Sequence, residues 1–73
     1  MNQDILEGNW KQIKGSVKEM WGRLTDDELD QIEGRRDRLV GILQERYGYT
    51  QLEAEEAITS FLDQFEADVS RRF

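Results

Sequence analysis

The strongest structural signals in this chain lie in residues 25–49, TDDELDQIEGRRDRLVGILQERYGY. The stretch begins with a capping box, in which the Thr25 hydroxyl accepts a backbone N–H and the Glu28 carboxylate accepts one in return. Apolar residues follow at the three- and four-residue intervals of a helix. The stretch closes near Gly48, a residue typical of helix ends. The sequence leaves open whether the helix breaks at Gly34 or continues through it.

The residues before this stretch predict an amphipathic helix. Its apolar side chains recur at alternating intervals of four and three residues: Leu6, Trp10, Ile13, Val17, Met20 and Leu24. Asn2 or Asp4 could cap its start. Trp21-Gly22 predicts its end, with Gly22 in the left-handed conformation that closes many helices. The aromatic side chains expected in the core are Trp10, Trp21, Phe61 and Phe65.

The residues after the stretch predict a last helix. It starts at a second capping box, formed by Thr50 and Glu53, and Arg71 and Arg72 lie at the end where the helix dipole favours cations. The side chains expected on its buried face are Ala54, Ala57, Ile58, Phe61, Leu62, Phe65 and Val69. We therefore predict an all-α fold, a compact array of four helices with a short second helix, in a single domain of residues 1–73.

The glycines indicate an internal repeat. They stand seven residues apart in two ladders, Gly8, Gly15, Gly22 and Gly34, Gly41, Gly48. Superposing the ladders with an offset of 26 residues matches Ile13 with Leu39 and Val17 with Leu43. A Thr-x-x-Glu box follows each ladder. The pattern predicts that the array is built from two copies of one helical unit.

The glycines within the predicted helices lie nearly opposite the apolar stripes, because each residue advances about 100° around a helix. An exposed glycine there costs roughly 0.8–1 kcal/mol of stability relative to alanine. Three interpretations stay open: weakly stable helices that tolerate glycine, a face that a second helix or a partner approaches closely, or a different helical phase. The second interpretation makes Gly15 and Gly41 candidate contact residues.

The composition excludes several kinds of site. The 73 residues include no Cys and no His, which removes thiol chemistry, disulfides, the commonest general base and the commonest zinc ligands. The net charge of −6 disfavours nucleic acid as a partner, because a phosphate backbone attracts basic surfaces. The first residues lack the pattern of a signal peptide, and no apolar run approaches the ~18 residues of a membrane span. We expect a cytoplasmic protein with no membrane partner.

Charged clusters provide the remaining candidate sites. Acidic residues gather in the first turns of predicted helices, at Asp26, Asp27, Glu28, Asp30, Glu53, Glu55 and Glu56. Capping explains them better than a metal site or a catalytic carboxylate pair. Two basic patches are also present, first Lys11, Lys14 and Lys18, then Arg35, Arg36 and Arg38.

The two basic patches have different expected partners. The lysine stripe faces either an acidic helix of the same fold or an external anion, and in the second patch Arg36 can pair locally with Glu33. Neither patch comes with a residue that would make it catalytic. We identify no catalytic, cofactor-binding or metal-binding residue in the sequence.

Two segments resemble a known family. Residues 8–27, GNWKQIKGSVKEMWGRLTDD, and residues 33–49, EGRRDRLVGILQERYGY, are similar to the CsbD-like family of small bacterial stress-response proteins, most of all to its Gram-negative branch. The resemblance implies association with general stress. It also implies, for some members, a grouping with the hydrophilins, which are hydrophilic, glycine-containing proteins thought to protect others during water loss. It supplies no catalytic residues, and the match is weaker beyond Thr50.

The leading hypothesis is therefore a non-enzymatic stress-response protein of undefined biochemical activity, with hydrophilin-like protection as its most specific form. The mean hydropathy of −0.81 is compatible with such a role. The alternative is a small helical module that binds another protein through its glycine face or through Lys11, Lys14 and Lys18. The sequence does not determine the oligomeric state, and it implies no cofactor.

Overall fold

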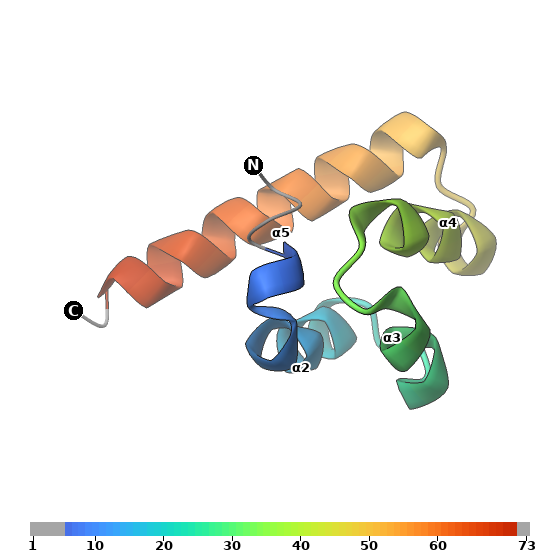
Figure 1. The fold of residues 1–73 in the computed structure, drawn as a ribbon. Helices are drawn as coiled ribbons and strands as arrows, with labels where there is room; N and C mark the ends of the chain where they lie inside the picture. The colour runs from blue at the N-terminus through green and yellow to red at the C-terminus, as the bar shows by residue number, and fades with distance from the viewer. Residues whose placement is uncertain (1–5, 72–73) are drawn as a thin grey trace.

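The computed structural model describes the backbone of residues 6–71 and the side chains of residues 6–67. Within these residues the chain is helical apart from its turns and connections (Figure 1). Residues 6–8 form one helical turn, and they are followed by α2 (Trp10–Met20), α3 (Asp26–Ile32), α4 (Arg36–Tyr47) and α5 (Gln51–Arg71). The all-α prediction is confirmed, and the second of the four predicted helices, α3, is the short one.

The longest helix, α5, runs across one side of the molecule, and the other described helices lie on one side of it (Figure 1). The helix α4 packs against both α5 and α3. The C-terminal end of α5 extends beyond the other helices (Figure 1). In the described part of the chain, no helix combines the length and the apolar character needed to cross a membrane.

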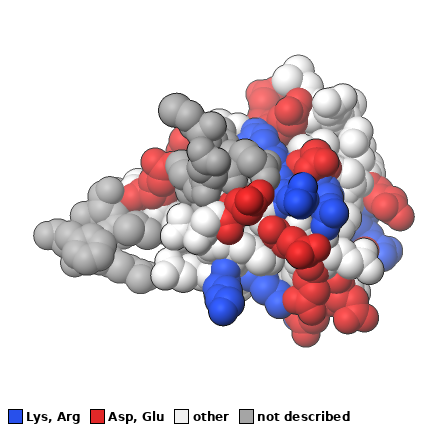
Figure 2. Space-filling view, in the orientation of Figure 1, with Lys and Arg blue, Asp and Glu red and all other residues white. Residues whose placement is uncertain are grey.

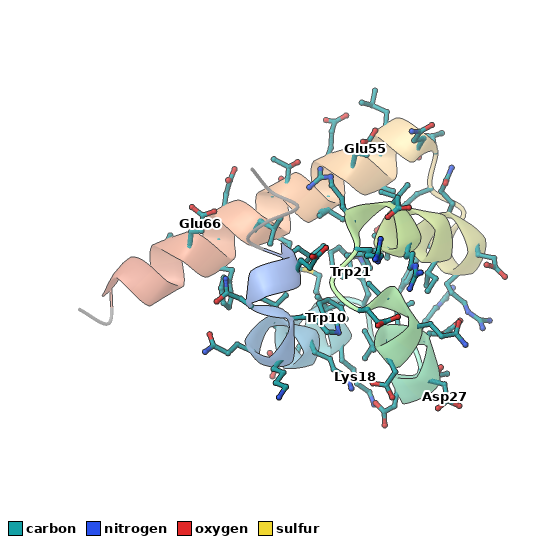
Figure 3. All side chains as sticks on the ribbon, viewed as in Figure 1. Trp10, Lys18, Trp21, Asp27, Glu55 and Glu66 are labelled. Atoms are coloured by element: carbon teal, nitrogen blue, oxygen red, sulfur yellow. The ribbon has the colours of Figure 1, made fainter. Side chains whose placement is uncertain are left out.

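The core is formed by side chains from every described helix. Among the described residues, its buried members are all apolar: Leu6, Ile13, Val17, Trp21, Leu24, Leu29, Ile32, Leu39, Val40, Leu43, Ala54, Ile58, Phe61 and Leu62. Trp21 lies near the centre of the molecule (Figure 3), where its ring centroid is 5.5 Å from that of Phe61. Trp10 and Phe65, both predicted for the core, are half-buried and pack against it.

Both capping boxes are confirmed. The Thr25 hydroxyl oxygen accepts the Glu28 N–H at 3.1 Å, and the Glu28 carboxylate accepts the Thr25 N–H at 2.9 Å. The second box has the same distances, with Glu53 N–H to Thr50 Oγ1 at 3.1 Å and Thr50 N–H to Glu53 Oε1 at 2.9 Å. These reciprocal bonds satisfy helix N–H groups that would otherwise lack partners, so they mark where α3 and α5 begin.

The first predicted helix is wrong in one respect, because a turn at Asn9 separates residues 6–8 from α2. The Asn9 carbonyl accepts the N–H of Ile13 at 2.9 Å, so a new helix starts there. At the other end, Met20 was expected in the core but its side chain is 56% exposed. Trp21 is buried in its place, because the chain leaves the helix there and turns the indole inward.

The prediction of a left-handed Gly22 is also wrong. The residue that caps α2 is Trp21, with φ −123° and ψ 76°, and its N–H donates to the Val17 carbonyl at 2.8 Å. Gly48 does close α4 in the left-handed conformation, with φ 70°. The predicted caps at Asn2, Asp4 and Arg72 lie outside the described residues, as do the side chains of Val69 and Arg71.

The chain breaks at Gly34, which answers the question that the sequence left open. Glu33 and Gly34 are both left-handed, with φ 52° and 76°, so α3 cannot continue into α4. Gly34 is buried and not exposed, contrary to the helical-wheel prediction. A Cβ on Gly34 would lie 2.7 Å from the Glu7 Cα and 3.0 Å from the Leu6 carbonyl oxygen. The first helical turn therefore packs so closely on this residue that only glycine fits.

The helix bounds agree with the repeat in its first half. The helices α2 and α4 begin 26 residues apart, at Trp10 and Arg36, which is the offset of the glycine ladders. The matched pairs Ile13 with Leu39 and Val17 with Leu43 are all fully buried. The copies diverge at the glycines that end the helices and at the lengths of α3 and α5.

Candidate interaction surface

The predicted lysine stripe lies on α2, and two of its three members face α3. Lys14 forms an ion pair with Asp30, and the Lys18 ammonium nitrogen lies 2.6 Å from an Asp26 carboxylate oxygen. Two lysines one turn apart thus meet two aspartates one turn apart, in opposite chain directions. Figure 3 shows Lys18 on the side of α2 that lies near α3. The stripe was predicted to face either an acidic helix of the same fold or an external anion. Lys14 and Lys18 face the acidic helix α3.

Lys11 is placed differently from the other two lysines. It is exposed, and no ion pair to it is seen among the described residues. It borders an open hollow of about 680 Å³ between α2 and α3, which is also lined by Trp10, Lys14, Asp30 and Glu33. Two lysines and three carboxylate residues line this hollow, so its charges largely compensate one another. Figure 2 likewise shows acidic and basic side chains intermingled on one face of the molecule.

The two candidate glycines both lie on open helix surface. Gly15 on α2 and Gly41 on α4 are exposed, and a Cβ added to either would meet no atom within 4 Å. The helical-wheel prediction of their exposure is therefore confirmed. Within the described part of the chain no other helix approaches them closely, which leaves both faces open to another molecule.

The far side of α3 faces α4 through a second set of charges. The Arg46 Nε donates to Glu28 at 2.7 Å, and the Arg38 guanidinium donates to Glu33 at 3.0 Å and to the Gln31 carbonyl at 2.8 Å. These pairs were not predicted from the sequence, because the partners are separated by up to 18 residues. Arg38 and Arg46, at the start and end of α4, did indicate that α4 could form ion pairs. Which acids they meet depends on how α3 packs against α4.

The predicted local pair of Glu33 with Arg36 needs correction. Glu33 pairs with Arg38, and Arg36 reaches across to α5. There its guanidinium donates to the Glu55 carbonyl at 2.9 Å and to the Thr59 hydroxyl at 2.7 Å. Arg36 therefore joins α4 to α5.

A second missed contact joins the end of α4 to the connection before α3. The Tyr47 hydroxyl accepts the Arg23 N–H at 3.1 Å, and the Arg23 guanidinium carbon lies 5.3 Å from the centre of the Tyr47 ring. That ring stacks on Tyr49, with 5.7 Å between centroids. Both the cation–ring contact and the ring–ring contact are favourable, because the aromatic ring carries an electrostatic quadrupole.

The electrostatics of this surface stabilise charged forms. The hydrogen bond from Lys18 lowers the pKa of Asp26, and the Thr25 N–H, with Arg46, lowers the pKa of Glu28. In the same way, the hydrogen bond to Asp30 raises the pKa of Lys14. These shifts keep exposed acids and bases ionised at neutral pH, whereas general acid–base catalysis needs a pKa moved toward neutrality. Among the described side chains, no three His, Cys, Asp or Glu residues converge on a possible metal position.

Residues 4–56 of the chain match the CsbD-like family model. This protein belongs to the CsbD-like family. The resemblance noted in the sequence is thereby confirmed, and the match extends a few residues beyond the two segments that suggested it.

Named relatives show how close this CsbD-like chain is to proteins of Gram-negative bacteria. It is 57% identical over 61 residues to the UPF0337 protein YjbJ of Escherichia coli (strain K12), an alignment that covers 84% of this chain and 88% of that protein. It is 51% identical over 63 residues to a UPF0337 protein of Bordetella pertussis, covering 86% of this chain and 96% of the relative.

Proposed function

We propose that this CsbD-like protein is a non-enzymatic stress-response protein that acts in the cytoplasm and protects other macromolecules by contact, in the manner of a hydrophilin. The observation that carries the proposal is the distribution of charge. Every buried side chain in the described part of the chain is apolar, while acids and bases lie intermingled at the surface. A hydrated surface of mixed sign can contact many partners weakly, and it keeps the protein itself soluble.

The exposed glycines support the same proposal. Gly15 and Gly41 weaken α2 and α4 without a packing gain inside the chain, since no neighbouring atom occupies the space beside them. Each is expected to cost roughly 0.8–1 kcal/mol relative to alanine. A small domain has little stability to spare, so these helices can loosen readily. Loosened helices can adapt to the varied surfaces of unrelated proteins.

The direct test is protection during drying. A labile enzyme such as lactate dehydrogenase is dried and rehydrated with increasing amounts of this protein, and its remaining activity is measured. We expect graded protection that exceeds the protection from an equal mass of another small acidic protein. Equal protection by that control would contradict the proposal. Deleting the gene in a host bacterium should also lower survival after osmotic, drying or oxidative stress, and unchanged survival in all three would count equally against it.

A second candidate function is a binding module for one protein partner. It is favoured by the accessible faces at Gly15 and Gly41, where a partner helix could approach the backbone closely. It is also favoured by Lys11, which borders the open hollow and forms no ion pair with the side chains that the structure describes. Glycine would let such a partner pack closely against the helix backbone, because any side chain at that position would hold the partner further away. This candidate predicts one stoichiometric complex, in place of weak contacts with many proteins.

Variants separate the two candidates. Gly15→Leu and Lys11→Glu change the open surfaces without touching the ion pairs of α3. A binding module should lose its complex with either variant, as measured by analytical ultracentrifugation with the purified partner. A general protectant should keep its activity in the drying assay with both variants. Reversing Lys14 or Lys18 is less informative, because both also hold α3 in place.

A further inference from the structure

The helix α3 is held between two neighbours by charge. Four ion pairs connect the segment of residues 26–33 with α2 on one side and α4 on the other: Lys14–Asp30, Lys18–Asp26, Arg46–Glu28 and Arg38–Glu33. Along the segment the pairs alternate between α2 and α4, so each side of α3 is held by two ion pairs. No comparable set of ion pairs is seen along α5 within the described side chains.

This helix cannot persist without its contacts. It has 7 residues, whereas isolated helices shorter than about 12–15 residues are marginal in water. It ends at Glu33, which adopts a left-handed conformation that non-glycine residues disfavour. Its apolar attachment consists of two buried side chains, Leu29 and Ile32. The docked position of α3 therefore depends on a small apolar contact together with the surrounding ion pairs.

Those ion pairs are largely open to dissolved salt: seven of their eight side chains are at least 35% exposed, and Glu28 is 16% exposed. In the pair nearest the start of α3, the side chains of Lys18 and Asp26 are 47% and 74% exposed. Salt shortens the range of such interactions, from a Debye length of about 10 Å at 0.1 M to about 3 Å at 1 M. The apolar side chains that hold α5 are not screened in this way. Rising salt should consequently weaken the attachment of α3 more than that of α5.

We propose that α3 is a salt-sensitive latch. At low ionic strength its ion pairs keep it docked, and at high ionic strength it is released more often, which uncovers Leu29, Ile32 and the apolar surface beneath them. Thr25 and Gly34 bound the moving segment, because the chain leaves helical geometry at both. The inference does not depend on the proposed function. It would give a protective protein a response to the rise in salt that accompanies water loss.

The test is residue-resolved hydrogen exchange of the full chain. Amide protection factors are measured by NMR in sodium chloride at about 0.05 M and about 1 M. We expect the amides of residues 29–32 to lose about threefold to tenfold of their protection at high salt, while the buried amides of α5 keep theirs. Sucrose at the same osmolality should not release α3, since it does not screen charge. A uniform change in all helices, or no change in α3, would overturn the proposal.

Matched variants isolate the role of the ion pairs. Lys14→Met and Lys18→Met each remove one positive charge that faces α3, while Lys11→Met removes the same charge from the same helix without breaking a pair. We expect α3 to exchange faster at low salt in the first two variants, with a smaller further response to salt. Lys11→Met should behave like the original protein. If all three variants behave alike, charge pairing does not hold α3, and the proposal fails whatever the drying assay shows.

Discussion

The helices α3 and α5 begin alike and are stabilised differently. Each begins at a Thr-x-x-Glu capping box with hydrogen bonds of 2.9 and 3.1 Å, yet α3 has 7 residues and α5 has 21. Two apolar side chains anchor α3, whereas α5 contributes four buried ones, Ala54, Ile58, Phe61 and Leu62, and two half-buried ones, Ala57 and Phe65. Both helices begin at a capping box, but α3 ends where Glu33 and Gly34 turn left-handed, whereas α5 continues over a larger apolar surface.

The largest expected effect comes from removing a core side chain under each helix. Ile58 in α5 and Ile32 in α3 are both fully buried. We expect Ile58→Ala to lower the free energy of unfolding by about 2–5 kcal/mol, through lost burial and the cavity left behind. Ile32→Ala should cost less, because the short α3 can shift to close the space. Urea denaturation measures both values, and equal losses would show that α3 is as integral to the core as α5.

The next effect compares the glycines that precede and follow α4. Gly34 and Gly48 are both left-handed, and placing alanine in that conformation costs about 1–2 kcal/mol. Only at Gly34 would the new Cβ also meet backbone atoms, at 2.7 Å from the Glu7 Cα. Gly34→Ala should therefore lower the melting temperature more than Gly48→Ala does. Gly22→Ala is the control, since Gly22 is not left-handed and a Cβ there meets only the Lys18 carbonyl, at 3.9 Å.

A smaller effect, of opposite sign, is expected in α2 and α4. Gly15→Ala and Gly41→Ala should each raise the free energy of unfolding by roughly 0.8–1 kcal/mol, because alanine restricts the unfolded chain and has open space in the folded one. The two gains should add, since the residues lie on different helices. Thermal and urea denaturation of the single and double variants check this. Destabilisation by either change would mean that the glycine face is packed against something in solution.

The smallest effect concerns pH and distinguishes α3 from α5. The pKa values of Asp26 and Glu28 are lowered by their hydrogen bonds, so the unfolded chain takes up protons at a higher pH than the folded one. Their contribution to stability is present at neutral pH and is lost as the pH falls below the ordinary carboxyl range of about 4. Lys14, with its raised pKa, loses its contribution at the alkaline end, above about 10.4.

We therefore expect α3 to lose amide protection before α5 as acid is added. Asp26→Asn should remove part of this response, because the neutral amide cannot form the charged pair with Lys18. Asp27→Asn is a matched control on the same turn, since no ion pair to Asp27 is seen among the described side chains. Identical acid profiles for the two variants would show that the pairing of Asp26 adds nothing measurable.

Local patterns were enough to predict the helical class, both capping boxes, the end of α4 at Gly48 and most of the buried side chains. These features arise from hydrogen bonds within four residues and from the periodicity of one helix, which any short window of the chain contains. The exposure of Gly15 and Gly41 followed from the same periodicity. The family resemblance was likewise visible in two short segments.

Other features arose from contacts between segments that are distant in the sequence. Gly34 is buried because the first helical turn packs onto it, and Lys14 meets Asp30 because α3 folds back along α2. Met20, on the predicted apolar stripe, is exposed because α2 ends there and the chain turns. No window of a few residues contains both partners of such a contact. Their geometry exists only once the helices have packed, and so does the set of ion pairs that holds α3.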